Sequence, residues 1–215
     1  MEEKIVYFEK VGPENTETTL SIVKERAKEL GITTILVAST RGDTAARAVE
    51  VFKGAKVVAV GHMTGYREPN TQEFTEENRE KVESKGGVVL STRHAFGGFT
   101  RTGGHDHASE VAHQPVAQAS ASNETGEIIA RTLRIFGAGM KVVCEIAVMA
   151  ADAGLVRTDE DVIVVAGSGR GADTAVVLRP ANSRDLFRLR VKEILCKPHL
   201  TVERRQEAVA AAHHH

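Results

Sequence analysis

The fold of this chain is decided by the stretch Ile35-Leu36-Val37-Ala38-Ser39-Thr40-Arg41-Gly42-Asp43-Thr44-Ala45-Ala46-Arg47-Ala48-Val49. Its first four residues form a short apolar run rich in branched side chains, which predicts a buried parallel strand. The next four are small, polar or flexible, and we expect a helix to begin at Thr44, capped by Asp43 or Thr44. A strand, a tight loop and a helix in this order present unpaired N–H groups at the carboxyl edge of a sheet, a geometry that binds phosphate.

The polar side chains of this loop fit an anion site. The hydroxyl groups of Ser39, Thr40 and Thr44 are hydrogen-bond donors, and Arg41 adds positive charge. The alternative is an ordinary strand-to-helix turn in which the hydroxyl groups serve as helix caps. The stretch by itself leaves both interpretations open.

A second copy of the pattern supports the ligand interpretation. It is the stretch Val162-Ile163-Val164-Val165-Ala166-Gly167-Ser168-Gly169-Arg170-Gly171-Ala172-Asp173-Thr174-Ala175. Like the first copy, it runs from an apolar strand to an Arg-Gly pair and then to Asp-Thr-Ala. Its glycines let backbone amides approach a ligand closely. The apolar residues 175–178 that follow predict a strand, so this loop is expected to be a glycine hairpin and not a Rossmann phosphate loop.

Length and composition restrict the class of protein. The chain has 215 residues, and we assign residues 1–200 to a single α/β ligand-binding domain and residues 201–215 to a solvated tail with the remnant of an expression tag. A net charge of -1 gives no basic surface for nucleic acid. No apolar run approaches the ~20 residues of a membrane span. Cys144 and Cys196 lie in apolar contexts, and with no signal segment at the start a cytoplasmic protein with reduced thiols is expected.

Apolar runs and helical periods alternate along most of the chain. We expect strands at 5–8, 33–38, 56–60, 88–92, 162–166, 175–178 and 189–195, and helices at 15–30, 44–53, 75–85, 123–136 and 139–153. Asn15 or Thr16 is expected to cap the first helix. The fold class is therefore α/β, a three-layer domain with a mostly parallel central sheet and helices on both faces. Its ligand should lie outside the carboxyl ends of the strands.

The histidines are the remaining candidates for chemistry. His62 and His94 each follow a strand and should face the ligand edge, where they could contact a ligand, transfer protons or serve a structural role. His105 and His107 lie in a long Gly- and His-rich segment, residues 93–121, which is either a functional loop or partly disordered. Their spacing matches no zinc motif, so no metal site is expected.

Several stretches together resemble one known family. They are Tyr7-Phe8-Glu9-Lys10, Asn15-Thr16-Glu17, the loop at Ser39, Val60-Gly61-His62, Gly169-Arg170-Gly171-Ala172-Asp173-Thr174-Ala175 and Glu193-Ile194-Leu195-Cys196-Lys197-Pro198. The stretch 18–60 resembles the carboxy-terminal domain of pyruvate kinase, in which a Ser/Thr-Gly loop holds a phosphate of an allosteric sugar bisphosphate. The whole chain is more similar to small stand-alone proteins built on that domain, and this resemblance implies bound flavin mononucleotide.

The resemblance has two limits. The segment 96–114 has no counterpart in the pyruvate kinase domain, so effector binding is carried over for the loop at Ser39 and no further. The catalytic barrel of pyruvate kinase is absent from this sequence.

From these observations we expect the protein to bind a small phosphorylated molecule, with flavin mononucleotide (FMN) as the cofactor. The phosphate should lie on the amides of residues 40–44, and the second loop should close over the ligand. The residues expected to contact it are Asn15, Thr16, Ser39, Thr40, Arg41, Gly42, Asp43, Thr44, His62, Gly65, Gly167, Gly169, Arg170, Gly171, Asp173 and Thr174.

Two alternatives remain open from the sequence. One is a flavin-dependent oxidoreductase that uses His62 or His94, and the other is a regulatory module that senses a sugar phosphate or a nucleotide. Catalytic residues stay unknown, because no acid–base pair is spaced for a recognisable reaction. Neither nucleic acid nor a membrane is expected as a partner, and a homo-oligomer is compatible with the sequence.

Overall fold

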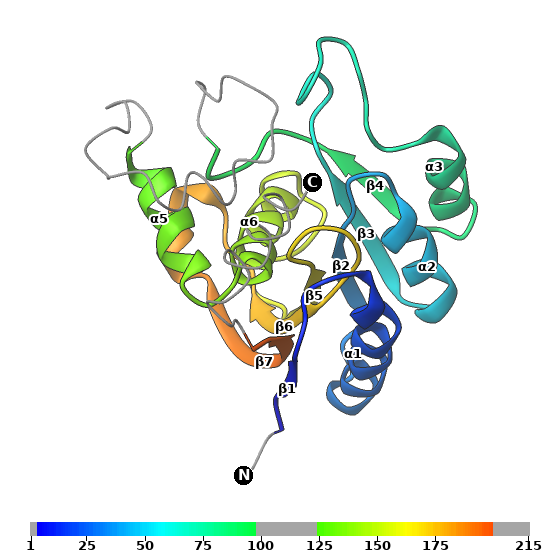
Figure 1. Ribbon diagram of the computed structural model, residues 1–215, viewed down its shortest axis with the longest axis vertical. Helices are drawn as coiled ribbons and strands as arrows, with labels where there is room; N and C mark the ends of the chain where they lie inside the picture. Colours follow the sequence, from blue (N-terminus) through cyan, green and yellow to red (C-terminus); the bar gives the residue numbers. More distant parts are fainter. Residues whose placement is uncertain (1–3, 98–123, 200–215) are drawn as a thin grey trace, which may run out of the picture.

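The computed structural model describes residues 4–97 and 124–199. Within these residues seven strands form one sheet in the order β1-β7-β6-β5-β2-β3-β4 (Figure 1). The strands are β1 Val6–Phe8, β2 Thr34–Ala38, β3 Lys56–Gly61, β4 Val88–Ser91, β5 Val162–Ala166, β6 Thr174–Arg179 and β7 Arg190–Pro198. Strand β6 is antiparallel to both of its neighbours, and every other pair is parallel. The mostly parallel sheet is therefore confirmed.

Helices cover both faces of this sheet. They are α1 Thr16–Leu30, α2 Asp43–Val51, α3 Glu76–Glu83, α5 Glu124–Arg134 and α6 Ala138–Asp152, with short 3-10 helices η1 Pro13–Asn15 and η3 Ser183–Arg188. Parallel neighbours such as β2 and β3 need a crossover, and α2 supplies it between them. The three-layer α/β architecture expected from the sequence is confirmed.

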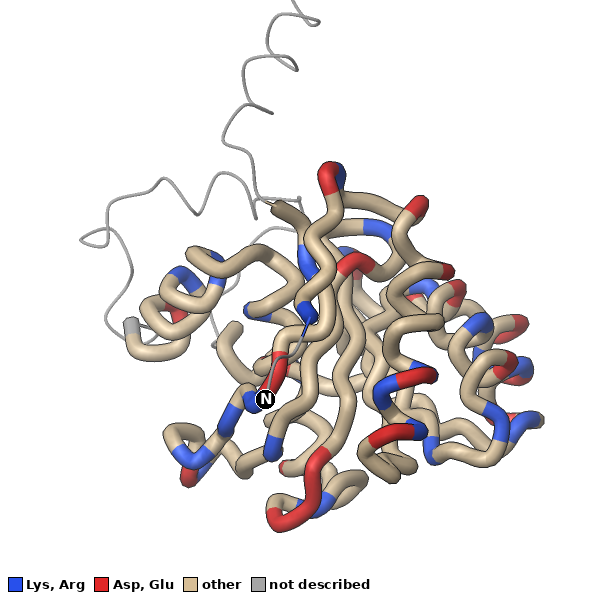
Figure 2. The backbone as a smooth tube through the Cα atoms, turned by 90° about the horizontal axis from the view of Figure 1, so that it is seen from below, with Lys and Arg blue, Asp and Glu red and all other residues tan. Residues whose placement is uncertain are grey.

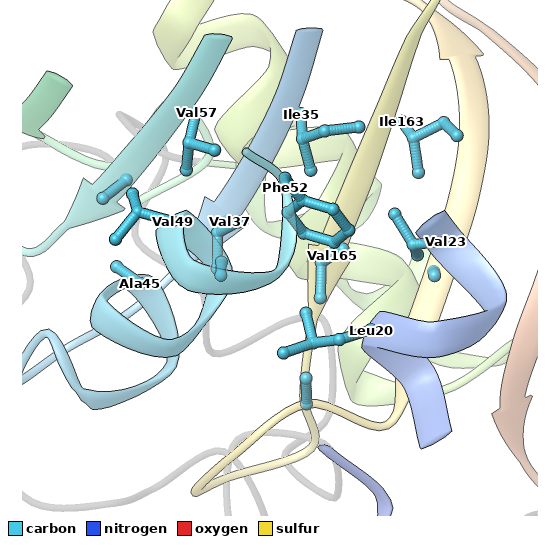
Figure 3. Close-up of a cluster of buried hydrophobic side chains, with 14 of the residues drawn as sticks. Leu20, Val23, Ile35, Val37, Ala45, Val49, Phe52, Val57, Ile163 and Val165 are labelled. Atoms are coloured by element: carbon cyan, nitrogen blue, oxygen red, sulfur yellow. The ribbon is translucent and has the colours of Figure 1, made fainter. Parts of the chain in front are cut away.

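One face of the sheet packs against α1, α2 and α3. Leu20 and Val23 of α1 contact a layer formed by alternate strand residues such as Ile35 and Ile163, and all four are fully buried (Figure 3). Successive strand side chains point to opposite faces, so the intervening residues belong to the second core. Burial on both faces explains why these strands are continuous apolar runs without polar alternation.

The other face packs against α5 and α6. Helix α6 is apolar on almost every side, and twelve of its fifteen residues are buried. It contacts the second set of strand residues, among them Leu36, Val58 and Val164. A helix buried all round cannot be placed on a sheet face from its period alone, but its apolar composition did predict burial.

Charged residues lie mainly outside these layers. Figure 2 shows both signs interspersed on the helices and strand ends, while the strands in the middle of the view carry few charges. This distribution agrees with the net charge of -1. No helix within residues 4–97 and 124–199 is both long enough and apolar enough to cross a bilayer.

The helix caps differ from those expected. Helix α2 begins at Asp43, and its N-cap is Gly42, so neither Asp43 nor Thr44 caps it with a side chain. The acceptor is Ser39, whose Oγ accepts a hydrogen bond from the amide of Ala45 at 3.3 Å. Asn15 is the N-cap residue of α1, but its side chain donates to the carbonyl of Lys10 at 2.7 Å. Local sequence cannot reveal such partners, because they depend on how the loop folds back on itself.

Candidate functional site

The two loops with matching sequence lie side by side at the carboxyl edge of the sheet. Strands β2 and β5 are parallel neighbours, with Val37 paired to Val165, so the loops that begin at Ser39 and Gly167 leave the same edge. Strand β3 pairs with β2 on its other side, and its last residue Gly61 is followed by His62. The expectation that these segments share one edge is confirmed.

The first loop presents unused amides at the start of α2. The amides of residues 40–44 donate no hydrogen bond within the part of the chain that the structure describes. The next two amides are used, because Ala45 donates to Ser39 Oγ and Ala46 donates to the carbonyl of Gly42 at 2.8 Å. The hydroxyl groups of Thr40 and Thr44 also have no hydrogen-bond partner among the described residues. Free amides at a helix N-terminus are the usual backbone donors for an anion.

The residues that follow β3 fix the shape of this loop. Gly42 has a φ of +96°, and a Cβ at that position would lie 2.5 Å from the Cβ of Asn78 and 2.6 Å from the ring of Phe74. The carbonyl of Arg41 accepts hydrogen bonds from the amide of Thr75 at 3.2 Å and from Asn78 Nδ2 at 3.0 Å. That carbonyl is therefore held by residues 75–78.

Two arginines add charge at this edge. Arg41 and Arg170 come from the loops after the neighbouring strands β2 and β5, and both are exposed. Neither makes an ion pair or hydrogen bond through its side chain within residues 4–97 and 124–199. Arg47 differs, because it is held by two 2.7 Å contacts to the carboxylate of Glu17. The carboxylate of Asp43 opposes an anion, but it is occupied by Asn78 Nδ2 at 3.0 Å.

The second loop is filled by its own aspartate. Asp173 is fully buried, and its Oδ2 accepts hydrogen bonds from the amides of Ser168 at 3.1 Å and Gly12 at 3.3 Å. Its Oδ1 accepts from the hydroxyls of Ser168 at 3.2 Å and Thr174 at 2.9 Å. Donors that could have faced a ligand are thus used internally. Asp173 and Thr174 are buried and support the loop, and a contact of either residue with a ligand stays a prediction.

The glycines of this hairpin have different roles. A Cβ at Gly167 would lie 2.3 Å from the carbonyl oxygen of Gly171, and a Cβ at Gly171 would lie 2.4 Å from the Cα of Pro13. These two glycines allow close packing of the chain on itself and not on a ligand. A Cβ at Gly169 would meet no atom within 4 Å, so this glycine and the adjacent Arg170 are the open part of the loop. The β5–β6 hairpin expected from the sequence is confirmed by its antiparallel register.

The start of α1 supports the same hairpin. Thr16 Oγ1 accepts a hydrogen bond from the amide of Ala172 at 3.0 Å. The side chain of Asn15 donates to the carbonyl of Lys10. Asn15 and Thr16 therefore lie at the expected edge, but the side chains of both already make hydrogen bonds within the protein. We therefore place Asn15 and Thr16 in the support of the site.

Three rings lie beyond the ends of β3 and β4. The ring of Tyr66 is 4.1 Å from that of His62 and 4.9 Å from that of His94, and the two histidines are 5.0 Å apart, between ring centroids. His62 Nδ1 lies 2.6 Å from Glu73 Oε2, and Glu73 Oε1 forms an ion pair with Arg67 Nε at 3.0 Å. Both histidines therefore lie at the carboxyl edge of the sheet, as expected.

The loop between His62 and Thr75 is closed by its own turn. Gly65 has a φ of +79°, and its amide donates to the carbonyl of Thr71 at 2.9 Å. Gln72 Nε2 donates to the carbonyl of His62 at 3.3 Å. Gly65 thus shapes the loop that carries Tyr66.

A buried ion pair lies beneath His94. Lys141 and Glu145 of α6 form a short ion pair, and their side chains are 7% and 3% exposed. Burial opposes ionisation of Glu145, but the charges of Lys141 and His94 and the hydrogen bonds from Lys141 and the Phe96 amide together outweigh it, so the pKa of this carboxyl is lowered from its ordinary value. Glu145 Oε1 also accepts from the amide of Phe96 at 3.1 Å, which fixes the segment after β4 to α6. No group of three or more metal-ligating side chains occurs within the described residues.

A comparison with protein families gives this site a context. The family described as "Pyruvate kinase, alpha/beta domain" matches residues 17–178, which is more than half of the chain. The chain belongs to the pyruvate kinase alpha/beta domain family. The matched region includes α1, the loop at Ser39 and the second glycine loop. The resemblance to the pyruvate kinase domain is thereby confirmed, and bound FMN stays a prediction.

Several residues of this pyruvate kinase alpha/beta domain protein were not expected at the site. Tyr66, Glu73 and Asn78 come from the excursion after β3, and Glu145 comes from an apolar helix. Asn78 and Glu73 contribute through contacts with residues more than ten positions away, which no local pattern encodes. A charged pair inside the apolar run of α6 was the available signal for Lys141 and Glu145, since buried charges are rare without a role. The predictions for His105 and His107 lie outside the described residues.

Proposed function

We propose that this protein binds a phosphorylated small molecule through the loop 39–44, with FMN as the leading ligand. The observation that carries the proposal is the set of free amides at residues 40–44, ahead of a nine-residue helix. The guanidinium groups of Arg41 and Arg170, which have no partner among the described residues, supply positive charge for a dianionic phosphate.

The rings beside the loop support a ligand with a planar part. Ser39 donates its amide to the carbonyl of Val60, and His62 follows two residues later, so the loop and the rings are adjacent along the edge. FMN combines a phosphate with a planar ring, and Tyr66 and Arg170 offer surfaces for stacking. Inorganic phosphate would use the loop alone.

A comparison of FMN with riboflavin tests the proposal, because the two differ by the phosphate. We expect the purified protein to quench the fluorescence of added FMN and to leave riboflavin unaffected at the same concentration. Equal binding of both would contradict anchoring by phosphate. No quenching by FMN, together with binding of inorganic phosphate by calorimetry, would retain the phosphate loop and reject the flavin.

Hydroxyl donors of the loop give a second test. Thr40→Ala and Thr44→Ala should each weaken FMN binding by ~1–3 kcal/mol, since each removes a donor to a charged acceptor. Thr33→Ala is the matched control, because Thr33 is exposed and lies before β2 at the opposite edge. Unchanged affinity in both loop variants would show that the anion is bound elsewhere.

A further inference from the structure

The ring cluster of His62, Tyr66 and His94 has features that ligand binding alone does not require. Each histidine follows a strand, and the carboxylate of Glu73 pairs with His62 at 2.6 Å. Tyr66 lies against both imidazoles. The cluster therefore combines one imidazole–carboxylate pair with a second imidazole and a phenol.

The carboxylate of Glu73 fixes the orientation of His62. Glu73 Oε2 is 2.6 Å from Nδ1, and the other carboxylate oxygen is held by Arg67, so the carboxylate accepts and Nδ1 carries the proton. Nε2 is then the nitrogen with the free lone pair, and it has no hydrogen-bond partner within the described residues. A carboxylate on one nitrogen of an imidazole, with the other open, is the arrangement of a general base.

An ion pair is built into the core next to this cluster. The side chain of Glu145 is 3% exposed, and it contacts Lys141 and the amide of Phe96, which follows His94 by two residues. Burying an ion pair is expensive, and an apolar pair of similar volume would be as stable or more so. Charged groups buried beside an open edge with shifted ionisation are typical of functional sites. The imidazole of His94 lies 5.0 Å from that of His62, between ring centroids.

We propose that this cluster is a proton-transfer centre for a phosphorylated carbonyl compound. The proposal rests on the phosphate-binding part of the function proposed above, because the loop 39–44 would anchor the phosphate of the carbonyl compound in place of that of FMN. His62 Nε2 removes a proton from the carbon next to the carbonyl group, and the electron pair of that C–H bond forms a carbon–carbon double bond. The carbonyl π electrons move to its oxygen, which receives a proton from His94 or Tyr66.

The reverse step returns a proton from His62 to carbon and regenerates the carbonyl group. No oxidant, reductant or metal enters this balance. When the base exchanges its proton with solvent before the return, the carbon acquires hydrogen from water. The class of reaction is therefore proton exchange or isomerisation next to a carbonyl group.

Deuterium exchange measures this step directly. The full-length protein is incubated in D2O with dihydroxyacetone phosphate or glycolaldehyde phosphate, and the loss of the C–H signal is followed by proton NMR. We expect exchange with the wild type and a rate at least ~100-fold lower for His62→Gln, as is usual when a general base is removed. The variant, purified in parallel, also reports any contaminating isomerase.

Glu73 is a positioning residue, and its variant should separate binding from turnover. Glu73→Gln should lower kcat about tenfold or more and leave KM unchanged, because it disturbs the orientation of His62 and not the phosphate loop. Glu68→Gln is the matched control, since Glu68 is exposed in the same loop and its side chain has no partner among the described residues. Equal kcat values for both variants would contradict the positioning role.

The outcomes distinguish this proposal from the one on which it rests. If inorganic phosphate binds but neither probe exchanges faster than with His62→Gln, the proton-transfer centre is rejected and the phosphate site remains. If inorganic phosphate does not bind, the proposed function is rejected, and the proton-transfer proposal that rests on it is rejected with it.

A second measurement uses diethylpyrocarbonate at pH 8, with mass spectrometry to locate the modified histidines. His62 should react faster than the exposed His199, and dihydroxyacetone phosphate should slow His62 alone. Slower reaction of His62 than of His199 would overturn the claim that Nε2 is open to a ligand.

Discussion

Replacing Asp173 tests whether the second glycine loop is a structural element. The fully buried carboxylate accepts four hydrogen bonds, two from backbone amides and two from hydroxyl groups. Asp173→Ala leaves the amides of Gly12 and Ser168 without an acceptor, and each unsatisfied partly buried donor costs about 1–2 kcal/mol. The two hydroxyl groups can rotate toward other acceptors, so we expect the free energy of unfolding to fall by about 3 kcal/mol.

Asp173→Asn removes the charge of the carboxylate but keeps an oxygen that can accept hydrogen bonds. Its amide oxygen can replace Oδ2 opposite the two amides, and its Nδ2 can donate to the hydroxyls of Ser168 and Thr174 after they reverse. What is lost is the charge assistance of two bonds, so the decrease should be about 1–2 kcal/mol. Asp185→Ala is the control, because the side chain of Asp185 is exposed and has no hydrogen-bond partner among the described residues.

Urea denaturation followed by circular dichroism gives these free energies. The expected order of midpoints is wild type equal to Asp185→Ala, then Asp173→Asn, then Asp173→Ala, with similar slopes for all four. An Asp173→Ala midpoint equal to that of the wild type would refute the structural role. An Asn variant as unstable as the Ala variant would show that the charge, and not the position of the acceptor, stabilises the loop.

Three further predictions concern chemistry and pH. The protein should not transfer phosphate from phosphoenolpyruvate to ADP, because that reaction needs metal ions to bridge the phosphates; turnover above background in a coupled assay with magnesium and potassium would contradict this. Tag-free protein should contain no stoichiometric zinc by elemental analysis; one zinc per chain, lost in a His105→Ala, His107→Ala double variant, would restore a metal site. The lowered pKa of Glu145 stabilises the fold above the unfolded pKa, and this contribution is lost as pH falls through the folded pKa. The unfolding free energy should therefore decrease from about pH 5 downward, more steeply in the wild type than in Glu145→Gln. The same dependence of unfolding free energy on pH in both proteins would exclude a stabilising role for ionised Glu145.

The elements of the fold were predictable because each carries a local signal. Strand β2 is a branched apolar run, α1 has an amphipathic period and ends at Gly31, and Thr75 caps α3 through its side chain. The order of the strands was not predictable, because the place of β6 between β5 and β7 depends on a hairpin and on which edge is left open.

The candidate site was predictable in position and less so in detail. Repetition of the sequence at Ser39 and Gly167 indicated two adjacent loops, and β2 and β5 are indeed neighbours. The two copies nevertheless differ by one residue, because Ala172 is inserted before the aspartate of the second loop. Asp173 is buried inside the hairpin and accepts hydrogen bonds from the amides of Gly12 and Ser168. The equivalent Asp43 stays exposed at the start of a helix. Burial of one carboxylate and exposure of the other are tertiary properties that the shared residues cannot encode.

The most direct test of the phosphate site is a titration of ¹⁵N-labelled protein with inorganic phosphate, followed by the shifts of assigned backbone amides. We predict that the largest shifts occur at residues 40–44, whose amides are free, and that the amides of Gly12 and Ser168 move little, because Asp173 already binds them. Largest shifts at Gly12 and Ser168, or no shift at residues 40–44, would contradict the account.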